Sequence, residues 1–385
     1  MADQENRVVW QHPEAGTIVP VNSPVDFHVQ LPWPSDYLIY PPLIDDIFGD
    51  GIFDPAAVIE TNVAASVTSA SGGAVYIGGN RAISGSSSAS YGPSYYNMTF
   101  GATPGLVFTL LAAVGATRAT HGVVYAGGGF AVGITDNSTG FTRINLTASN
   151  VALIGPNTTG SYRGGVYIGR GRVVAIPYNA TEFALIDTIE NTVEFFGDLS
   201  TQSGKYWGGV YVGYGKLVAI PHNAGQPLLV DVNDLSITPF GEVDESSQKY
   251  AGGVYLDHGR FATVPYLSPF IMLGDTHARV TRTFQCDIPG ANKYVGSVFI
   301  GDERYIAMPS NAEQFALVDC KERKVELFGT PNPATNKYVG GYYAGNGYIV
   351  AVSTTQNKIL DLGAGFRTNR VFGGEALLTA WFNKL

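Results

Sequence analysis

The segment Tyr162–Gly169, YRGGVYIG, decides the fold, because related segments follow it at a fixed spacing of 44 residues. They read YWGGVYVG from Tyr206, YAGGVYLD from Tyr250, YVGSVFIG from Tyr294 and YVGGYYAG from Tyr338. Two weaker copies precede them, SGGAVYIGG around Tyr76 and THGVVYAGG around Tyr125. A fixed period of about 20–50 residues is the signature of a repeat architecture. The sequence therefore predicts seven repeated units.

Each complete unit contains four short β-type runs. In the third copy these are GGVYIG, RVVAIP, FALIDT and TVEFFG, separated by Gly, Pro and Asn. Four strands in about 44 residues is the size of a propeller blade, and the 3.6-residue period of a helical repeat is absent. We therefore expect an all-β fold, a seven-bladed β-propeller of four-stranded blades that spans residues 61–385, in preference to an open solenoid.

The repeated module has the approximate form KYxGGVYxGxGKxVAIPxNA. In this respect the chain resembles the broad class of repeat propellers that includes kelch and WD-repeat proteins. It lacks the paired Gly-His and Trp-Asp of WD repeats and the kelch arrangement of paired glycines with distant Tyr and Trp. The module is also similar to those of uncharacterised microbial, protist and viral propellers. This resemblance implies a fold and leaves the activity open.

Composition restricts the classes of partner. The net charge of −9 disfavours binding to a phosphate backbone, so no nucleic-acid partner is expected. No apolar run reaches the roughly 18 residues that a membrane-spanning helix needs, so membrane insertion is not expected either. The two cysteines, Cys286 and Cys320, form no CxxC metal motif.

Residues that recur in every unit are expected to build the blades. This group comprises the aspartates Asp187, Asp231, Asp275 and Asp319 and the tyrosines Tyr162, Tyr206, Tyr250, Tyr294 and Tyr338. We expect the carboxylates to accept hydrogen bonds from the backbone or from Tyr hydroxyls, and the tyrosines to pack between blades. A ring of metal-binding carboxylates is disfavoured, since successive blades hold them too far apart to share one ion.

Residues that vary inside the constant frame are better candidates for binding, because loops on a rigid scaffold carry recognition. Two positions stand out, the residue between the recurring Tyr and Gly and the residue after the recurring Pro. If both lie on one rim of the ring, they form an aromatic and polar patch that suits a sugar face or a partner protein. The candidates are Arg163, Tyr178, Trp207, His222 and Tyr266. The competing interpretation is packing between blades.

Catalytic signals are weak. None of the six histidines has a metal-ligand spacing, and neither a GxSxG elbow nor a phosphate-binding GxxxxGK[ST] loop occurs. We therefore predict no catalytic residue, no metal, no cofactor and no enzymatic activity. A glycosidase-type pair of carboxylates in the central channel stays open as an alternative, since sequence does not show carboxylate separations.

Residues 1–60 lie outside the repeat and are rich in Pro and aromatic residues. This composition is too apolar for a free linker, so we expect an extended arm that packs against the propeller or another subunit. A propeller also needs a device that closes the ring. Either the segment around residues 61–70 or the C-terminal tail is expected to supply the closing strand.

The functional hypothesis combines these points. A surface rich in Gly, Ser, Thr and Asn without an export signal favours a virion structural protein, such as a tail-fibre, spike or capsid-decorating propeller, assembled in the host cytoplasm. Its arm would bind other structural proteins, and its rim surface glycans of the host. Two alternatives are a cytoplasmic protein-interaction scaffold and a propeller lectin or glycan-active enzyme.

Overall fold

The computed structural model describes residues 7–12, 26–30, 54–64, 74–78, 81–84, 94–99, 105–110, 120–135, 140–158, 160–345, 347–353 and 356–363. Within these ranges the chain forms strands and one short 3-10 helix, η1 (Pro55–Ala57), which Asp54 caps by accepting a hydrogen bond from the Ala56 N–H at 2.9 Å. No helix in this part of the chain is long and apolar enough to cross a membrane.

Six four-stranded antiparallel sheets are each formed by four consecutive strands. The first two contain β4 (Ala74–Gly78), β5 (Arg81–Ser84), β6 (Ser94–Thr99) and β7 (Gly105–Leu110), then β8 (Thr120–Gly127), β9 (Phe130–Thr135), β10 (Phe141–Asn145) and β11 (Asn150–Ile154). The next two contain β12 (Tyr162–Gly169), β13 (Arg172–Pro177), β14 (Phe183–Asp187) and β15 (Thr192–Phe196), then β16 (Tyr206–Gly213), β17 (Lys216–Pro221), β18 (Leu228–Asp231) and β19 (Ser236–Pro239). The last two contain β20 (Tyr250–Asp257), β21 (Arg260–Pro265), β22 (Phe270–Asp275) and β23 (Val280–Gln285), then β24 (Tyr294–Gly301), β25 (Arg304–Pro309), β26 (Phe315–Asp319) and β27 (Lys324–Phe328).

A further four-stranded sheet is composite. It joins β28 (Gly340–Gly345), β29 (Tyr348–Val352) and β30 (Gln356–Asp361) to β3 (Ile59–Ala64), which comes from the other end of the repeat region. Strand β3 pairs antiparallel with β30 from Ile59 opposite Asp361 to Ala64 opposite Gln356. The ring is therefore closed by the segment near residue 61, one of the two candidates from the sequence.

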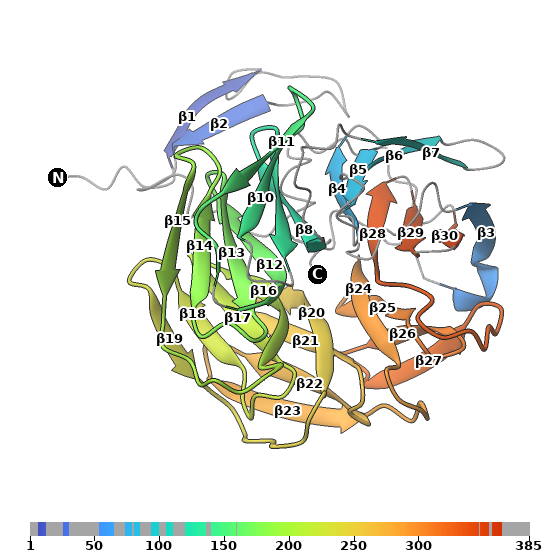
Figure 1. Ribbon diagram of the computed structural model, residues 1–385. Coiled ribbons are helices and arrows are strands. Elements are labelled where there is room, and N and C mark those ends of the chain that lie inside the picture. The colour runs from blue at the N-terminus through green and yellow to red at the C-terminus, as the bar shows by residue number, and fades with distance from the viewer. Residues whose placement is uncertain are drawn as a thin grey trace.

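The first strand of each sheet lies innermost, and these strands pack in the cyclic order β4, β8, β12, β16, β20, β24 and β28, with β28 beside β4. Figure 1 shows the resulting ring, with β28–β30 next to both β4 and β3. The predicted propeller of four-stranded blades is confirmed. The expectation of seven repeated units is corrected, because only six blades are continuous in sequence. The sheet that closes the ring takes β28, β29 and β30 from one end of the repeat region and β3 from the other.

The predicted arm, residues 1–60, lies largely outside the described residues. Within it, β1 (Arg7–His12) and β2 (Asp26–Gln30) pair as a two-stranded antiparallel sheet. The C-terminal tail after residue 363 also lies outside the described residues.

Burial follows the position of a strand within its blade. Second strands such as β13 are buried at every residue except the first, because they lie between two other strands and between two neighbouring blades. Outer strands such as β15 alternate between exposed and more covered residues, which is the pattern of a half-solvated strand. The core is thus a ring of inter-blade layers.

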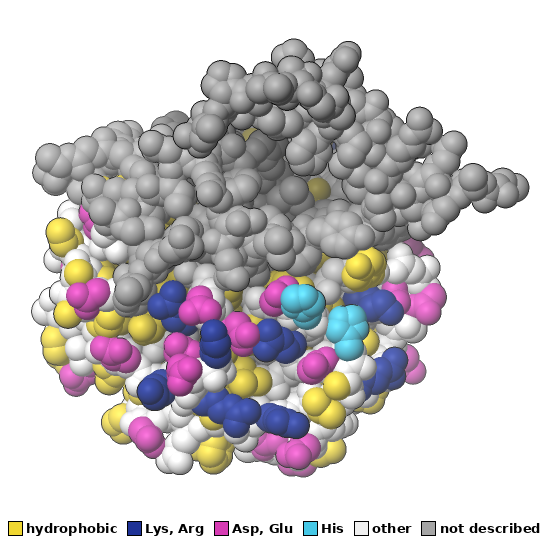
Figure 2. Space-filling view, turned by 180° about the vertical axis from the view of Figure 1, so that it is seen from behind, with side chains coloured by type: hydrophobic (Ala, Val, Ile, Leu, Met, Phe, Trp, Pro, Cys, Tyr) yellow, Lys and Arg dark blue, Asp and Glu magenta, His cyan; other side chains and the backbone are white. Residues whose placement is uncertain are grey.

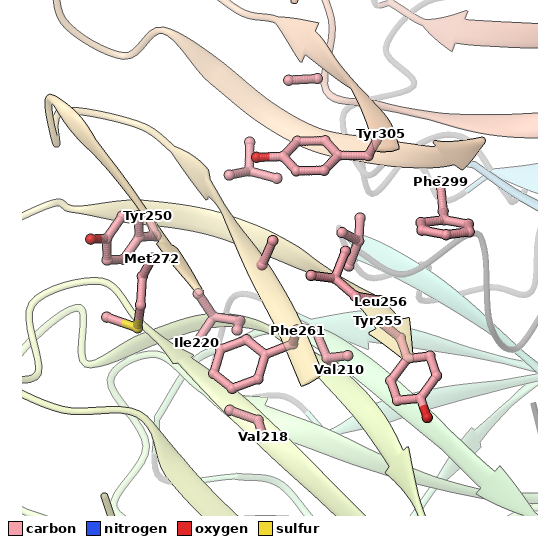
Figure 3. Packing of buried hydrophobic residues seen from close by; sticks show 14 of the residues in the cluster. Val210, Val218, Ile220, Tyr250, Tyr255, Leu256, Phe261, Met272, Phe299 and Tyr305 are labelled. Atoms are coloured by element: carbon pink, nitrogen blue, oxygen red, sulfur yellow. The ribbon is translucent and has the colours of Figure 1, made fainter. Parts of the chain in front are cut away.

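Aromatic side chains fill these layers. Tyr162 meets Phe141 of the preceding blade edge to face, with ring centroids 5.1 Å apart, and Tyr338 meets Phe315 at 5.5 Å. Figure 3 shows Phe261 of β21 beside Val218 of β17, within the same buried cluster. Each blade therefore completes the core of its neighbour, so one isolated repeat would leave its apolar faces exposed.

Hydrogen bonds also join the blades. The buried Tyr305 hydroxyl of β25 donates to the carbonyl oxygen of Thr263 in β21 at 2.8 Å. Burial, with smaller contributions from neighbouring Cys and Tyr side chains, raises the pKa of Tyr305 well above its ordinary value, so this phenol stays a donor over the whole physiological pH range. The bond satisfies a polar group that burial would otherwise destabilise.

Candidate functional site: an aromatic cluster on the axial rim

In the inner strands β12, β16, β20 and β24, the variable residue after the recurring Tyr lies in a β-bulge. In the pairing of β12 with β13, Tyr162 lies opposite Pro177 and Gly165 opposite Ala175, so the register shifts across Arg163 and Gly164. The same shift recurs between Tyr206 and Gly209 of β16. Bulges interrupt the alternation of a strand and re-aim side chains. The repeat therefore keeps its glycines constant and leaves one re-aimed side chain per blade free to vary.

The variable residue after each recurring Pro lies at the same end of the blade. Tyr178, His222 and Tyr266 follow the last residues of β13, β17 and β21. Since the first two strands of a blade are antiparallel, the end of the second strand lies beside the start of the first. Both variable positions thus reach one rim of the ring, close to the axis.

The structure brings all five candidate side chains of the sequence analysis into one cluster. Trp207 lies at its centre, with its ring centroid 5.1 Å from His222, 5.4 Å from Tyr266 and 6.1 Å from Tyr178. His222 lies 5.8 Å from Tyr178 and 5.5 Å from Tyr266. We call Arg163, Tyr178, Trp207, His222 and Tyr266 the rim cluster.

Arg163 adds a cation to these rings. Its guanidinium carbon lies 3.9 Å from the centroid of the Tyr178 ring and 4.5 Å from that of Trp207. A cation over an aromatic face contributes about 0.5–2 kcal/mol, the larger values where water is excluded. These two contacts restrict the rotamers of all three side chains and tie the blade of β12 to the blade of β16.

His222 is the buried member, with 1% of its surface exposed. Its Nδ1 atom lies 2.8 Å from the carbonyl oxygen of Tyr250 on the next blade. Burial, aided by the nearby charges of Arg163 and Lys249, lowers the pKa of His222 to about 4. The ring is therefore neutral at pH 7, and its Nδ1–H donates to the Tyr250 carbonyl, which leaves the lone pair on Nε2.

The other members are partly exposed. Tyr178, Trp207, Tyr266 and Arg163 each keep intermediate exposure. Burial raises the pKa of Tyr266, and the positive charge of Arg163 opposes that rise. The cluster thus combines three partly exposed aromatic rings with one fixed positive charge, in a chain whose net charge is −9.

The cluster is confined to three adjacent blades. The bulge position holds Ala251 in β20, Val295 in β24 and Val339 before β28, and the position after Pro309 holds Ser310. Val295 and Ser310 are buried, at 9% and 5% exposure. The ring therefore departs from its repeat at one arc. Elsewhere Figure 2 shows acidic and basic side chains intermixed over the described part of one face.

The recurring aspartates have a local role in each blade. Asp187 Oδ1 accepts hydrogen bonds from the N–H groups of Ile189 and Glu190, both at 2.9 Å. Asp275 does the same with His277 and Ala278. Asp231 and Asp319 each accept one such bond, from Asn233 and Glu322. The acceptors therefore bind the turn between the third and fourth strands of their own blade.

The recurring tyrosines lie in the inter-blade layers. Tyr162, Tyr206, Tyr250, Tyr294 and Tyr338 are all buried, with exposures between 0% and 6%. The Tyr294 hydroxyl donates to the carbonyl oxygen of Gln314 at 3.3 Å. Burial raises the pKa of Tyr250 to about 12, so its phenol is neutral at pH 7. These residues hold the ring together away from the rim.

Sequence reasoning gave no role to the lysine that precedes four of the five recurring tyrosines. Lys205, Lys249, Lys293 and Lys337 are buried, with exposures of 2%, 0%, 2% and 6%. Lys205 Nζ donates to the carbonyl oxygen of Gln202 at 2.9 Å, and Lys249 Nζ to that of Asp244 at 2.8 Å. Burial lowers the pKa of each of the four. The signal was their 44-residue period, which marks a structural lysine that fixes the loop before the inner strand.

The recurring asparagines bridge neighbouring blades at this same end. Asn179 Oδ1 accepts from the N–H of Gly204 at 2.8 Å, and Asn223 Oδ1 from that of Gln248 at 2.7 Å. Their side-chain carbonyls fix the loop that precedes the next blade, next to the rim cluster.

The cluster presents aromatic rings, one guanidinium and one neutral imidazole. Its five side chains include one imidazole and no carboxylate or thiol. Among the described residues, no group of three or more His, Cys, Asp or Glu side chains is placed to hold a metal ion. The two cysteines are buried, and burial raises the pKa of both thiols.

The ring of four-stranded antiparallel sheets around an axis defines a β-propeller, and its variable rim defines a candidate binding surface. No protein-family model and no curated protein matches the sequence. Solved structures match the fold. A streptogramin B lyase has a TM-score of 0.63 and 10% identity over 80% of this chain and 98% of the lyase. Virginiamycin B lyase from Staphylococcus aureus has a TM-score of 0.62 and 12% identity over 79% and 98%.

The WD40 repeats of RRP9 are also similar, with a TM-score of 0.60 and 9% identity over 78% of this chain and 97% of that one. At such identities the likeness shows the fold alone. Because lyases and a WD40-repeat protein share it, the fold is compatible with both an enzyme and a non-enzymatic binding protein.

Proposed function

We propose that the chain is a non-enzymatic protein-binding propeller and that the rim cluster is the centre of its partner interface. The observation that carries this proposal is the convergence of Arg163, Tyr178, Trp207 and Tyr266 on one arc of a repeated ring. Trp, Tyr and Arg are the residues in which binding hot spots are enriched, and hot spots gather near the centre of an interface. The structural repeat does not require them, since the same positions elsewhere hold Ala, Val and Ser.

The rigidity of the cluster supports the same conclusion. Arg163 is stacked on two rings, and His222 is fixed by its bond to the Tyr250 carbonyl. Side chains that are already ordered lose little conformational entropy when a partner binds. A preorganised aromatic surface of this kind gains affinity without a change of backbone conformation.

The test compares Trp207→Ala with Val339→Ala, a truncation at the residue after the recurring Tyr338, in a blade outside the cluster. Each variant and the unchanged chain are used as bait, and bound proteins are quantified by mass spectrometry. Removal of a central Trp is expected to weaken a specific partner by about 2 kcal/mol or more, roughly 30-fold, whereas Val339→Ala retains it. The proposal is wrong if both variants capture the same proteins in the same amounts.

The narrower assignment to a virion rests on composition and stays a prediction. It is tested by a mass-spectrometric search for this chain in purified particles from its source. The prediction of host glycans as ligands uses the same rings, since aromatic faces also suit sugars. A glycan array probed with the unchanged chain and with Trp207→Ala separates this alternative from a protein partner.

A further inference from the structure

The rim cluster has a positive potential in a chain that is acidic overall. Burial is the main cause of the low pKa of His222, and the cations Arg163 and Lys249 lower it further. The charge of Arg163 also opposes the rise that burial causes in the pKa of Tyr266, so its field extends across the cluster. None of the five side chains is a carboxylate, whereas the whole chain has a net charge of −9. An acidic ligand is therefore attracted to this arc, although the net charge of the chain disfavours it elsewhere.

Arg163 is the cation that an incoming ligand meets. It keeps intermediate exposure, whereas Lys249 is fully buried and donates to the carbonyl oxygen of Asp244. Its contacts with the rings of Tyr178 and Trp207 hold the guanidinium in place. The N–H donors of a guanidinium lie in its plane, in a fork that matches the two oxygens of a carboxylate. Arg163 is thus suited to a planar acid in particular.

The aromatic rings continue from Arg163 along the arc. Trp207 lies on the next blade, with its ring centroid 4.5 Å from the guanidinium carbon, and Tyr266 lies one blade further, 5.4 Å from Trp207. Side chains on one face of an extended peptide are about 7 Å apart, because each residue adds about 3.3 Å. A peptide whose acidic side chain meets Arg163 therefore places the side chain two positions away against Trp207 and Tyr266. These partly exposed rings suit an apolar or aromatic residue.

This combination of a cation and rings occurs once among the units that begin with the recurring Tyr. The position of Arg163 holds Ala251, Val295 and Val339 in three of the other units, and Trp207 in the fourth. The repeat does not require a charge there. The guanidinium is thus a feature of one arc, beside the rings that it contacts.

We propose that the partner of the rim cluster presents an acidic peptide segment. One Asp or Glu of this segment binds Arg163, and an apolar or aromatic residue two positions away packs on Trp207 and Tyr266. The inference rests on the proposed function, namely that the rim cluster is a protein interface, and it adds the chemical class of the partner. A glycan that carries a carboxylate is the competing ligand, and the experiment separates the two.

The test selects a library of random linear peptides, displayed on phage, against the unchanged full chain. Recovered peptides are synthesised, and fluorescence anisotropy measures their affinities for the unchanged chain and for Trp207→Ala, Arg163→Gln and Arg170→Gln. The last variant is the matched control, because it removes the same charge from the same blade. Arg170 is exposed in the turn between β12 and β13, at the opposite end of the inner strand from Arg163.

Peptides that bind the rim cluster are recognised by their loss of affinity for Trp207→Ala. Among them, Asp or Glu two positions from an apolar or aromatic residue is expected several-fold above its frequency in the unselected library. Arg163→Gln should weaken their binding about tenfold or more, and Arg170→Gln by less than about twofold. Replacement of the acidic residue of the peptide by its amide should weaken binding to the unchanged chain to a similar extent, with little further loss in Arg163→Gln. Such coupling reports a direct contact, which a general effect on folding does not imitate.

The inference is overturned if the peptides that depend on Trp207 are not enriched in acidic residues, or if their amide variants bind the unchanged chain equally well. It is also overturned if no recovered peptide depends on Trp207, or if carboxylate-bearing glycans on an array bind in place of peptides and Arg163→Gln abolishes that binding. Peptides that depend on Trp207 but lack an acid leave the proposed function standing. Equal capture by Trp207→Ala and Val339→Ala in the bait comparison contradicts the proposed function itself, so the two proposals fail separately.

Discussion

At the residue scale, His222 is the group whose chemistry depends most on its surroundings. The equivalent positions in neighbouring blades hold Tyr178 and Tyr266, so the fold does not require an imidazole there. Its Nδ1–H is committed to the backbone of the next blade, and its neighbours are aromatic or cationic. A neutral imidazole is compatible with this environment, whereas an imidazolium is not.

Stability is therefore expected to fall between pH 6.5 and pH 4. The folded-state pKa of His222 is about 4, below its ordinary value of 6.5, so the unfolded chain takes up a proton first as the pH is lowered. The contribution is fully present above pH 6.5 and declines as the pH falls, with a loss of about 2–3 kcal/mol by pH 4.5. Urea unfolding at pH 7 and pH 4.5 should show this loss in the unchanged chain and a smaller one in His222→Gln. Equal losses in the two proteins would contradict the prediction.

At the scale of the element, the β-bulge at the start of the inner strands β12, β16, β20 and β24 re-aims the side chains that reach the rim. Gly208 adopts φ of +73°, and a Cβ atom there would lie 3.1 Å from the Cα of Gly252 on the next blade. Glycine is thus required twice, by the backbone conformation and by the close approach of two blades. The same bulge turns Trp207 towards the cluster.

Gly208→Ala is expected to destabilise the protein more than Gly213→Ala. Gly213 also has a positive φ, +96°, but an added Cβ there meets no atom within 4 Å. Both substitutions carry backbone strain of about 1–2 kcal/mol, and only Gly208→Ala adds a clash between blades, which we expect to cost about 1 kcal/mol more. Thermal or urea unfolding of the two variants measures the difference. If Gly213→Ala is the more damaging, the role given to the close approach is wrong.

At the scale of the whole molecule, the ring is held closed by contacts that join distant parts of the sequence. Glu60 of β3 forms an ion pair with Lys358 of β30 and accepts a hydrogen bond from the N–H of Thr330 on the preceding blade at 2.6 Å. Both charged side chains are nearly buried, at 12% and 11% exposure. The carboxylate thereby fastens the closing strand to two blades.

Glu60→Ala is expected to cost about 3 kcal/mol of unfolding free energy, because it leaves the Lys358 ammonium in a buried position without its carboxylate. The control is Lys216→Ala, which removes a surface ion pair with Asp231 at 2.8 Å and should cost less than about 1 kcal/mol. Equilibrium unfolding of both variants provides the comparison. A cost for Glu60→Ala no larger than the control would show that β3 is held by its backbone pairing alone.

The sequence by itself determined the features that repeat. The 44-residue period fixed the blade, its four strands and its constant glycines, since local strand propensity and turn residues act in the same way in every copy. Comparison of the copies also singled out Arg163, Tyr178, Trp207, His222 and Tyr266, because these positions depart from the repeat. Their use as a binding site stays a proposal.

Only the tertiary structure decided what depends on contacts between distant residues. The choice of β3 as the closing strand rests on its pairing with β30, almost 300 positions away, which no local pattern specifies. The centroid distances within the rim cluster depend on the curvature of three blades, and the burial of Lys205 and Lys249 on the loops that enclose them. The 44-residue period predicts the strands and turns within one blade. The closing strand and the rim cluster depend on how neighbouring blades pack around the axis of the ring.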